Sequence, residues 1–388
     1  MEANTVKEYS GLVGFLKSSQ DEKWKSMHNE RTCFEAYEQI KKNLKPIVDD
    51  VERGAMCNDI KIELEKYKME IQKIIDGDSD NKQEQIGQLL DSDPVIFLND
   101  HGRDHIDMVL KKASEIVSNF FGEPLSEFET FILVCAIEIH DIGNLFGREN
   151  HEKNLNRIFD EKCKDIIIDN PEKRAIKSIA MAHGGKNRLG SKDTISNLPN
   201  IEYILGEKIH PRLLASIVRF ADELADDSTR ASRGPLEFSI IGDNSILYQN
   251  YSKSLHTVVL DKESKYINGN NDIFIRLVYE LNIDDLKKKY NCGVYEKYLL
   301  DEIYDRTLKM ERERRYCIKF IGTFINISKI VVIINIYNDT TLEKIDTISY
   351  TLEDCTYPDE PQSGSIKAIA GNNIRTGEEE LKKIMEGD

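Results

Sequence analysis

The sequence lacks an apolar run long enough to cross a bilayer, which takes about 20 residues in a helix. Its longest unbroken apolar run, Phe131–Ile137, is far shorter. The N-terminus also lacks the basic and then apolar pattern of a secretory signal. The seven cysteines are scattered and form no CxxC pair, so neither a zinc knuckle nor a redox dithiol is expected. These absences predict a soluble, cytoplasmic protein with reduced cysteines.

Basic residues are fewer than acidic residues. Lys and Arg number 53 against 69 Asp and Glu, which gives a formal net charge of −16. A field of that sign repels polyanions at long range, so duplex DNA or RNA is not expected as a partner. A small phosphorylated substrate remains compatible with this charge, because a bound metal ion and a few local Arg or Lys override the global sign. Neither a Walker-type phosphate loop nor a glycine-rich dinucleotide fingerprint occurs.

Residues 1–95 read as an N-terminal region of charged amphipathic helices. Phe34–Val51 and Ile60–Ile75 carry apolar residues at three- and four-residue spacing, and Gly77–Gln85 is a polar break. Nothing in this region carries chemistry. We expect it to provide a packing or oligomer surface.

Residues 96–235 form the next region and carry stronger helical patterns. An apolar stripe extends from Ile106 to Phe120. Ser126 and Glu129 form a capping box for the next helix, whose sequence FETFILVCAIEI is apolar almost all round and therefore predicts a buried position. Pro211 begins a further helix, LLASIVRFADEL. We expect an all-α bundle.

Beyond Gly234 the pattern favours strands. LEFSIIG, SILYQNY and HTVVLD show β-branched residues and alternation, and KYINGNNDIFIRLVYEL reads as two strands around an Asn-Gly turn. A charged helix over Tyr295–Arg315 and a strand in TFINISKIVVIINIY follow. The predicted fold class is thus α+β: a helical core, an α+β region over residues 236–355, and a polar tail over 356–388.

Histidine is scarce too, but it is clustered. The chain has eight, and six of them fall within the 110 residues from His101 to His210, where an even scatter would put about two or three. The excess indicates a site. The six are His101, His105, His140, His151, His183 and His210.

Two acids stand where a helix faces the core. The His140–Asp141 pair ends the buried helix, and Asp222 lies four residues after Val218 at the edge of an apolar stripe. A buried carboxylate needs a partner. One divalent cation bound by both acids and the clustered imidazoles would explain why all of them are present. The alternative is that the two acids are buried in ordinary salt bridges.

The order of these residues resembles the HD-domain superfamily of metal-dependent phosphohydrolases. The matching stretches, NDHGRDHIDMV, ILVCAIEIHDIGN and LLASIVRFADELAD, span roughly residues 96–235. The resemblance implies that four residues from separate helices hold one divalent cation: His105, His140, Asp141 and Asp222. Mixed His and carboxylate ligands do not decide among Mn, Mg, Fe, Co, Ni and Zn.

Two narrower likenesses concern function. LDEIYDRTLKMERERRYC, followed by strands, resembles HD domains of bacterial conflict systems, some of them fused to chaperone-type ATPases that this chain lacks. In deoxynucleoside triphosphohydrolases of the superfamily, histidines after the HD pair act on the phosphates. Here Asn144 stands where one such histidine is expected, so that match is partial.

Further residues are expected to act on the substrate. His151, His183 and Arg148 are the candidates for catalysis, although His151 could be an ordinary loop residue and His183 a ligand of a second metal ion. Arg binds phosphate oxygens bidentately, with a surface ion pair as the competing interpretation. The candidates for substrate binding are Lys186, Arg188, Arg219, Arg230, His101 and Asn144.

The sequence therefore predicts a nucleotide phosphohydrolase, specifically a deoxynucleoside triphosphate triphosphohydrolase serving antiphage defence. A cyclic-dinucleotide phosphodiesterase is one alternative, but that subgroup carries paired histidines and a GYP motif, whereas AHGG has one histidine and no GYP occurs. A non-catalytic nucleotide-sensing module is another, and the presence of all four ligands argues against it. We expect a homo-oligomer with a small nucleotide substrate, a possible nucleotide effector, and no membrane partner.

Overall fold

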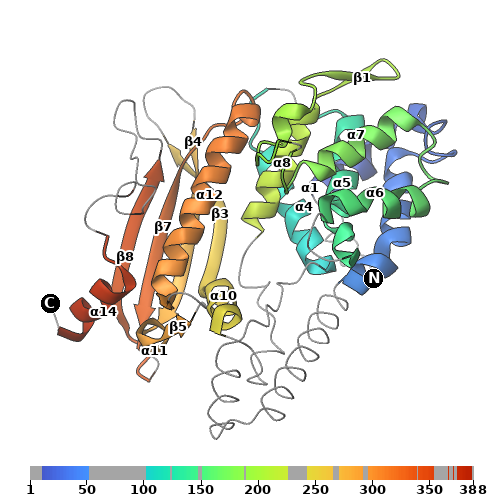
Figure 1. Cartoon of the computed structure of the whole chain (residues 1–388). Helices are drawn as coiled ribbons and strands as arrows, with labels where there is room; N and C mark the ends of the chain where they lie inside the picture. Colours follow the sequence, from blue (N-terminus) through green and yellow to red (C-terminus); the bar gives the residue numbers. More distant parts are fainter. Residues whose placement is uncertain are drawn as a thin grey trace, which may run out of the picture. The chain divides into compact units, whose positions relative to one another are not determined.

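The chain is an α+β protein, as predicted, and its contacts divide it into two compact units (Figure 1). The helical unit draws on Met1–Arg53, His101–Ala225 and Glu313–Asn326. The sheet unit draws on Gly54–Asp100, Asp226–Arg312 and Ile327–Asp388. The computed structural model describes residues 11–51, 102–122, 125–146, 151–187, 189–225, 243–264, 271–291, 296–338, 340–353, 366, 370 and 374–386.

The helical unit is built around one buried helix, α5 (Glu127–Ile139). The predicted capping box is present, since the Ser126 hydroxyl accepts from the Glu129 amide and the Glu129 carboxylate accepts from the Ser126 amide. Every residue from Phe128 to Ile139 is buried, which is why the sequence of this helix is apolar on all sides.

The helices that pack against α5 include α1 (Gly11–Ser19), α4 (Arg103–Val117), α7 (Asn170–Met181) and α8 (Pro211–Leu224). Pro211 opens α8 as predicted, because proline at the first turn of a helix loses no hydrogen bond. α4 also packs against α8, so the helices that carry His105 and Asp222 lie side by side.

A helix over residues 33–51 agrees with the predicted Phe34–Val51 and is part of the core, since Tyr37, Ile40 and Leu44 are buried and the Tyr37 hydroxyl bonds to Glu138 of α5. The other elements of the helical unit are shorter. The 3-10 helix η2 (Ile142–Phe146) leads to α6 (His151–Lys162), and a small hairpin joins β1 (Glu202–Ile204) to β2 (Glu207–Ile209). The helical unit thus includes chain segments on both sides of the predicted core of residues 96–235.

The sheet unit has a four-stranded sheet in the order β3–β4–β7–β8 (Figure 1). β3 (Leu255–Ser264) pairs antiparallel with β4 (Asn271–Asn282), and β7 (Ile327–Tyr337) pairs antiparallel with β8 (Lys344–Glu353). β4 and β7 are parallel, which requires a crossover.

Helix α12 (Leu299–Ile321) lies within that crossover. Thr307 of α12 and Tyr350 of β8 hydrogen-bond through their hydroxyl groups at 2.9 Å, so this part of the helix packs on the sheet. The smaller elements of the crossover are α11 (Ile283–Lys287), β5 (Lys289–Asn291) and β6 (Glu296–Tyr298).

Two predictions for the C-terminal region were wrong. SILYQNY is not a strand but lies in α10 (Asp243–Ser254), where Leu247 and Tyr251 are buried four residues apart, at helical spacing. Part of the expected tail is also ordered, as helix α14 (Gly377–Glu386). The amide of Gly377 donates to Asp301 at 2.9 Å and anchors the start of that helix.

Several predicted features lie outside the described residues: Ile60–Ile75, Gly77–Gln85, LEFSIIG and the Asn-Gly turn. β3 confirms the strand predicted for HTVVLD, and β4 confirms the strand predicted after the turn. The strand predicted before the turn, in residues 265–267, lies outside the described residues. Within the described part of the chain, none of the helices has both the length and the apolarity needed to traverse a membrane.

Candidate metal centre

The HD pair stands where the buried helix ends. His140 is the C-terminal cap of α5 and Asp141 follows it. His140 is fully buried, and its Nδ1 donates to the carbonyl oxygen of Ile137 at 2.7 Å. That bond fixes the proton on Nδ1 and leaves the Nε2 lone pair directed into the site, which is the usual orientation of a metal-binding histidine.

His105 and Asp222 reach the same point from two neighbouring helices. His105 Nε2, from α4, lies 3.2 Å from Asp222 Oδ1 of α8 and 3.5 Å from Asp141 Oδ2. His140 Nε2 lies 3.4 Å from Asp141 Oδ2 and 3.8 Å from Asp222 Oδ1. The structure therefore brings together all four residues that the sequence analysis singled out as ligands.

This donor set fits a divalent cation. One potential ligand atom each from His105, His140 and Asp141 lies within 4.8 Å of the others. His140 Nε2 is buried and has no hydrogen-bond partner among the described residues, an arrangement that is costly unless the nitrogen binds something. Two imidazole nitrogens with carboxylate oxygens suit first-row divalent metals.

The candidate ligands differ in exposure. The side chain of Asp222 keeps 29% of its surface exposed, whereas His105 is 0% exposed. Asp222 is thus the most exposed of the four candidate ligands, while protein encloses the two histidines.

The charges within the cluster are strongly coupled. Burial alone would raise the pKa of Asp222, but the imidazoles of His105 and His140 hold the pKa of that carboxyl well below its usual range. Burial lowers the pKa of His140, yet the carboxylates of Asp141 and Asp222 outweigh burial and raise it to about 9. Without a cation, protonated imidazole thus balances the two carboxylates. A cation would displace that proton.

His183 is a fifth member of the cluster. It follows α7, is 7% exposed, and packs edge-on against the His140 ring with the centroids 5.0 Å apart. Its Nδ1 donates to the Ala180 carbonyl at 2.6 Å, so Nε2 faces the site, 3.7 Å from Asp141 Oδ1. Of the residues predicted for catalysis, His183 is the one whose described side chain lies beside the four ligands.

Behind the cluster, Glu138 ties two ligand-bearing helices together. It is 1% exposed and accepts two hydrogen bonds from Arg103, at 2.7 and 3.0 Å, and one from the Tyr37 hydroxyl at 2.8 Å. Sequence analysis did not identify Arg103 or Tyr37. The available signal was an acid in a buried helix, which requires partners, but nothing local in the sequence says which.

Arg219 differs from its predicted role. We expected it to clamp a substrate phosphate, but its guanidinium is 7% exposed and forms a bidentate ion pair with Glu313. We therefore do not include it among the substrate-binding residues. His210, in turn, donates from Nδ1 to Glu129 at 2.8 Å and helps to join α8 to α5.

The other predicted residues differ in how much of them the structure describes. Lys186 is exposed, and Asn144 donates its amide to the Asp141 carbonyl at 3.0 Å. His151 begins α6, but its side chain is not among the described ones. Four residues lie outside the described part of the chain: His101, Arg148, Arg188 and Arg230.

The helical bundle and its His/Asp cluster support an HD-type domain in this part of the chain. The family whose model matches is HD-CE, over residues 95–272, a stretch that contains all four candidate ligands and His183 and ends before α12. The comparisons with curated proteins and with solved structures gave no match. An HD-type domain with such a cluster supports assignment to the metal-dependent hydrolases.

Proposed function

We propose that the helical unit is a phosphohydrolase that cleaves a phosphoester of a small nucleotide, with a deoxynucleoside triphosphate as the substrate. The observation that carries this proposal is the convergence of His105, His140, Asp141 and Asp222 on one point, with His183 beside them. The resemblance to HD domains of bacterial conflict systems supports a role in antiphage defence.

His105, His140, Asp141 and Asp222 would hold the divalent cation. When bound, such a cation lowers the pKa of a coordinated water and withdraws electrons from a phosphoryl oxygen. The protein contributes the position of each donor, since His140 Nε2 and His183 Nε2 are both oriented by Nδ1 hydrogen bonds to backbone carbonyls. Little reorganisation is needed when charge develops in such a preorganised site.

His183 is suited to proton transfer. Its Nδ1 proton is held by Ala180, so Nε2 is the atom available to take a proton or, once protonated, to donate one to the leaving oxygen. Asp141 Oδ1 lies 3.7 Å from this nitrogen. A histidine in this role typically contributes about 10²–10⁴-fold to the rate.

The segment after His183 is suited to phosphate binding. A Cβ atom placed on Gly184 would meet no atom within 4 Å among the described residues, so the backbone there is open to a ligand. Exposed Lys186 follows two residues later. Backbone amides and an ammonium group are common phosphate ligands, and Arg148 and Arg188, although outside the described residues, remain proposed as further ones.

Overall charge favours a mononucleotide over a nucleic acid. Proteins bind nucleic acids mostly through cationic contacts to the phosphates. A chain with a net charge of −16 is poorly suited to make many such contacts with a long polyanion. A mononucleotide needs only the metal centre and two or three local cations. The partial likeness to deoxynucleoside triphosphohydrolases supports release of tripolyphosphate rather than stepwise loss of phosphate.

A product screen tests this proposal. The protein is incubated with dGTP, dATP, dCTP and dTTP, singly and mixed, with Mn, Mg or Co, and the products are separated by chromatography, with Asp141→Ala as the matched inactive control. Deoxynucleoside with tripolyphosphate supports the proposal. Orthophosphate with a nucleoside diphosphate, cleavage of cyclic dinucleotides, or cleavage of single-stranded DNA at a comparable rate would overturn the substrate assignment.

A further inference from the structure

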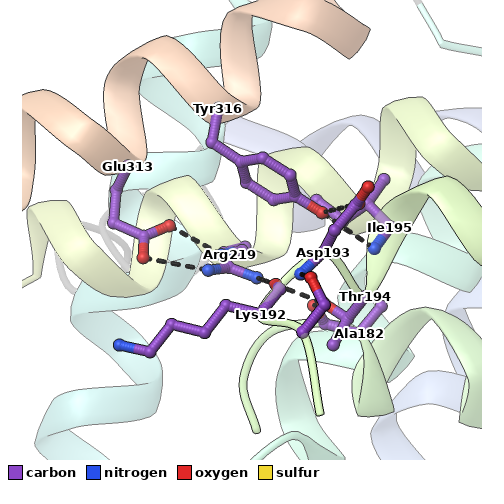
Figure 2. A network of polar contacts seen from close by, with 9 residues as sticks. Ala182, Lys192, Asp193, Thr194, Ile195, Arg219, Glu313 and Tyr316 are labelled. Carbon is purple, nitrogen blue, oxygen red and sulfur yellow. Dashed lines mark hydrogen bonds and ion pairs between the residues drawn. The ribbon is translucent and has the colours of Figure 1, made fainter. Parts of the chain in front are cut away.

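Arg219 lies three residues before the candidate ligand Asp222 on α8, close to one helical turn away. Its guanidinium donates from Nε to Glu313 Oε2 at 2.7 Å and from Nη2 to Glu313 Oε1 at 2.9 Å (Figure 2). This bidentate pair joins α8 to α12 within the helical unit. Such a geometry is directional as well as strong, so it fixes the orientation of the guanidinium.

The third nitrogen of Arg219 reaches the segment that follows His183. Nη1 donates to the Lys192 carbonyl at 3.0 Å and to the Thr194 hydroxyl at 3.1 Å. The Thr194 hydroxyl in turn donates to the carbonyl of Ala182 at 2.7 Å. Figure 2 shows this relay from the guanidinium to Ala182. Since Ala182 directly precedes His183, Thr194 connects Arg219 to the backbone that carries the histidine.

Tyr316 of α12 holds the same segment at a second place. Its hydroxyl donates to Asp193 Oδ1 at 2.7 Å and accepts from the Ile195 amide at 3.0 Å. Its ring also lies 4.5 Å from the Arg219 guanidinium, within range of a cation–π contact (Figure 2). Each residue from Lys192 to Ile195 therefore accepts or donates a hydrogen bond with a side chain of α8 or α12: Arg219 binds Lys192 and Thr194, and Tyr316 binds Asp193 and Ile195.

The segment between His183 and Thr194 turns at two glycines. Gly185 and Gly190 both adopt the left-handed backbone region, with φ of +69° and +78°. Glycine gives the chain these turns but also leaves it with more conformational freedom to lose on ordering. Asn187 orders the loop from within, since its side chain bonds to the backbone of Leu189, Ser191 and Asp193. The contacts of Arg219, Thr194 and Tyr316 fix this ordered loop to α8, to α12 and to the backbone before His183.

We propose that Thr194, Arg219 and Glu313 are positioning residues that hold His183 beside Asp141. This inference rests on the proposed function, in which His183 acts on the substrate. It also means that the site depends on residues beyond the stretch 95–272 that matches the family, because Glu313 and Tyr316 lie outside it.

Thr194 allows the sharpest test, because its hydroxyl can be removed without disturbing the ion pair. Thr194→Val keeps the shape of the side chain but loses the bonds to Arg219 and Ala182, whereas Thr194→Ser keeps the hydroxyl. Thr130→Val is the matched control. The Thr130 hydroxyl also donates to a backbone carbonyl, that of Ser126 at 2.8 Å, but lies in α5 outside the relay.

The first measurement does not depend on activity. Amide hydrogen exchange of residues 182–195 is followed in the metal-free protein by mass spectrometry. We expect at least about fivefold faster exchange in Thr194→Val and near wild-type exchange in Thr194→Ser and Thr130→Val, because local opening exposes amides in proportion to the lost restraint. Tyr316→Phe removes the other tether and should loosen the same segment.

The second measurement separates positioning from metal binding. Thr194→Val should lower kcat about tenfold while the metal-to-protein ratio stays at the wild-type value, because a misplaced proton-transfer group slows chemistry without removing a ligand. Thr194→Ser should restore kcat to within about twofold. A change in KM alone would mean that the segment binds substrate but does not position His183, and would overturn the inference.

The outcomes also separate this inference from the proposed function. Wild-type exchange and wild-type kcat in Thr194→Val would refute the positioning role, whatever His183 does. Normal hydrolysis by His183→Ala would instead refute the role proposed for His183, while exchange would still report whether Thr194 tethers the segment. If Thr194→Val does not fold, Tyr316→Phe decides by the same two measurements.

Discussion

Arg103 and Glu138 form a bidentate ion pair, and each stands two residues before a histidine of the metal centre. The pair joins α4 to α5 at 2.7 and 3.0 Å, directly behind His105 and His140. Its carboxylate is fully enclosed, and the Tyr37 hydroxyl donates to it as well. This contact outside the site thus helps to hold the register between the two helices, and with it the spacing of the two imidazoles.

Removal of this carboxylate should be costly. Glu138→Ala leaves the mostly buried Arg103 without its main partner, and we expect the free energy of unfolding to fall by about 3 kcal/mol. Chemical denaturation measures this loss. Asp160→Ala is the control, because the pair between Lys177 and the 54% exposed Asp160 lies at the surface, where removal should cost less than about 1 kcal/mol. Equal losses in the two variants would contradict the assignment.

The candidate ligands should be needed for turnover more than for folding. His105→Ala, His140→Ala and Asp222→Ala should each abolish hydrolysis, whereas circular dichroism should show the helical content retained, because the apolar faces of the helices hold the bundle together. Normal activity in two of these three folded variants would show that the ligand assignment is wrong.

His183 and His151 should act on the reaction rather than on metal retention. His183→Ala and His151→Ala are expected to keep the metal, and at least one of them should lose about 10²–10⁴-fold in kcat. Steady-state kinetics together with elemental analysis of each variant gives the answer. Loss of one of two bound ions in His183→Ala would instead make the centre dinuclear, with His183 as a ligand.

The metal-free protein should lose stability as the pH rises through the titration of His140. The pKa of this histidine is raised from an ordinary 6.5 to about 9, so its contribution is complete below about pH 6.5 and is lost by about pH 9. A cation competes with that proton, so the increase in Tm on adding metal should grow over the same range. His140→Gln should lack this dependence, and an unchanged pH profile in that variant would refute the explanation.

The parts of the site that follow local patterns could be predicted from sequence. The capping box at Ser126, the buried helix after it and the Pro211 helix start are confirmed, because each depends on residues within one or two helical turns. The meeting of His105 with Asp222 could not be deduced from spacing. It followed from the resemblance to a known family.

Long-range partners could not be predicted. Arg219 and Glu313 are 94 positions apart, and no pattern near Arg219 indicates that its guanidinium is buried rather than offered to phosphate. SILYQNY was misread for a related reason. Its β-branched and aromatic residues favour a strand locally, but burial of Leu247 and Tyr251 at helical spacing decides its structure.

The most direct test of the central claim is the metal content of the protein and of Asp141→Ala. Both are incubated with Mn²⁺, desalted, and measured by elemental mass spectrometry. The wild-type protein should retain about one or two divalent ions per chain, and the variant should lose most of them, because Asp141 supplies both a ligand oxygen and the balancing charge. Equal metal content in the two proteins, or none in either, would contradict a metal centre at His105, His140, Asp141 and Asp222.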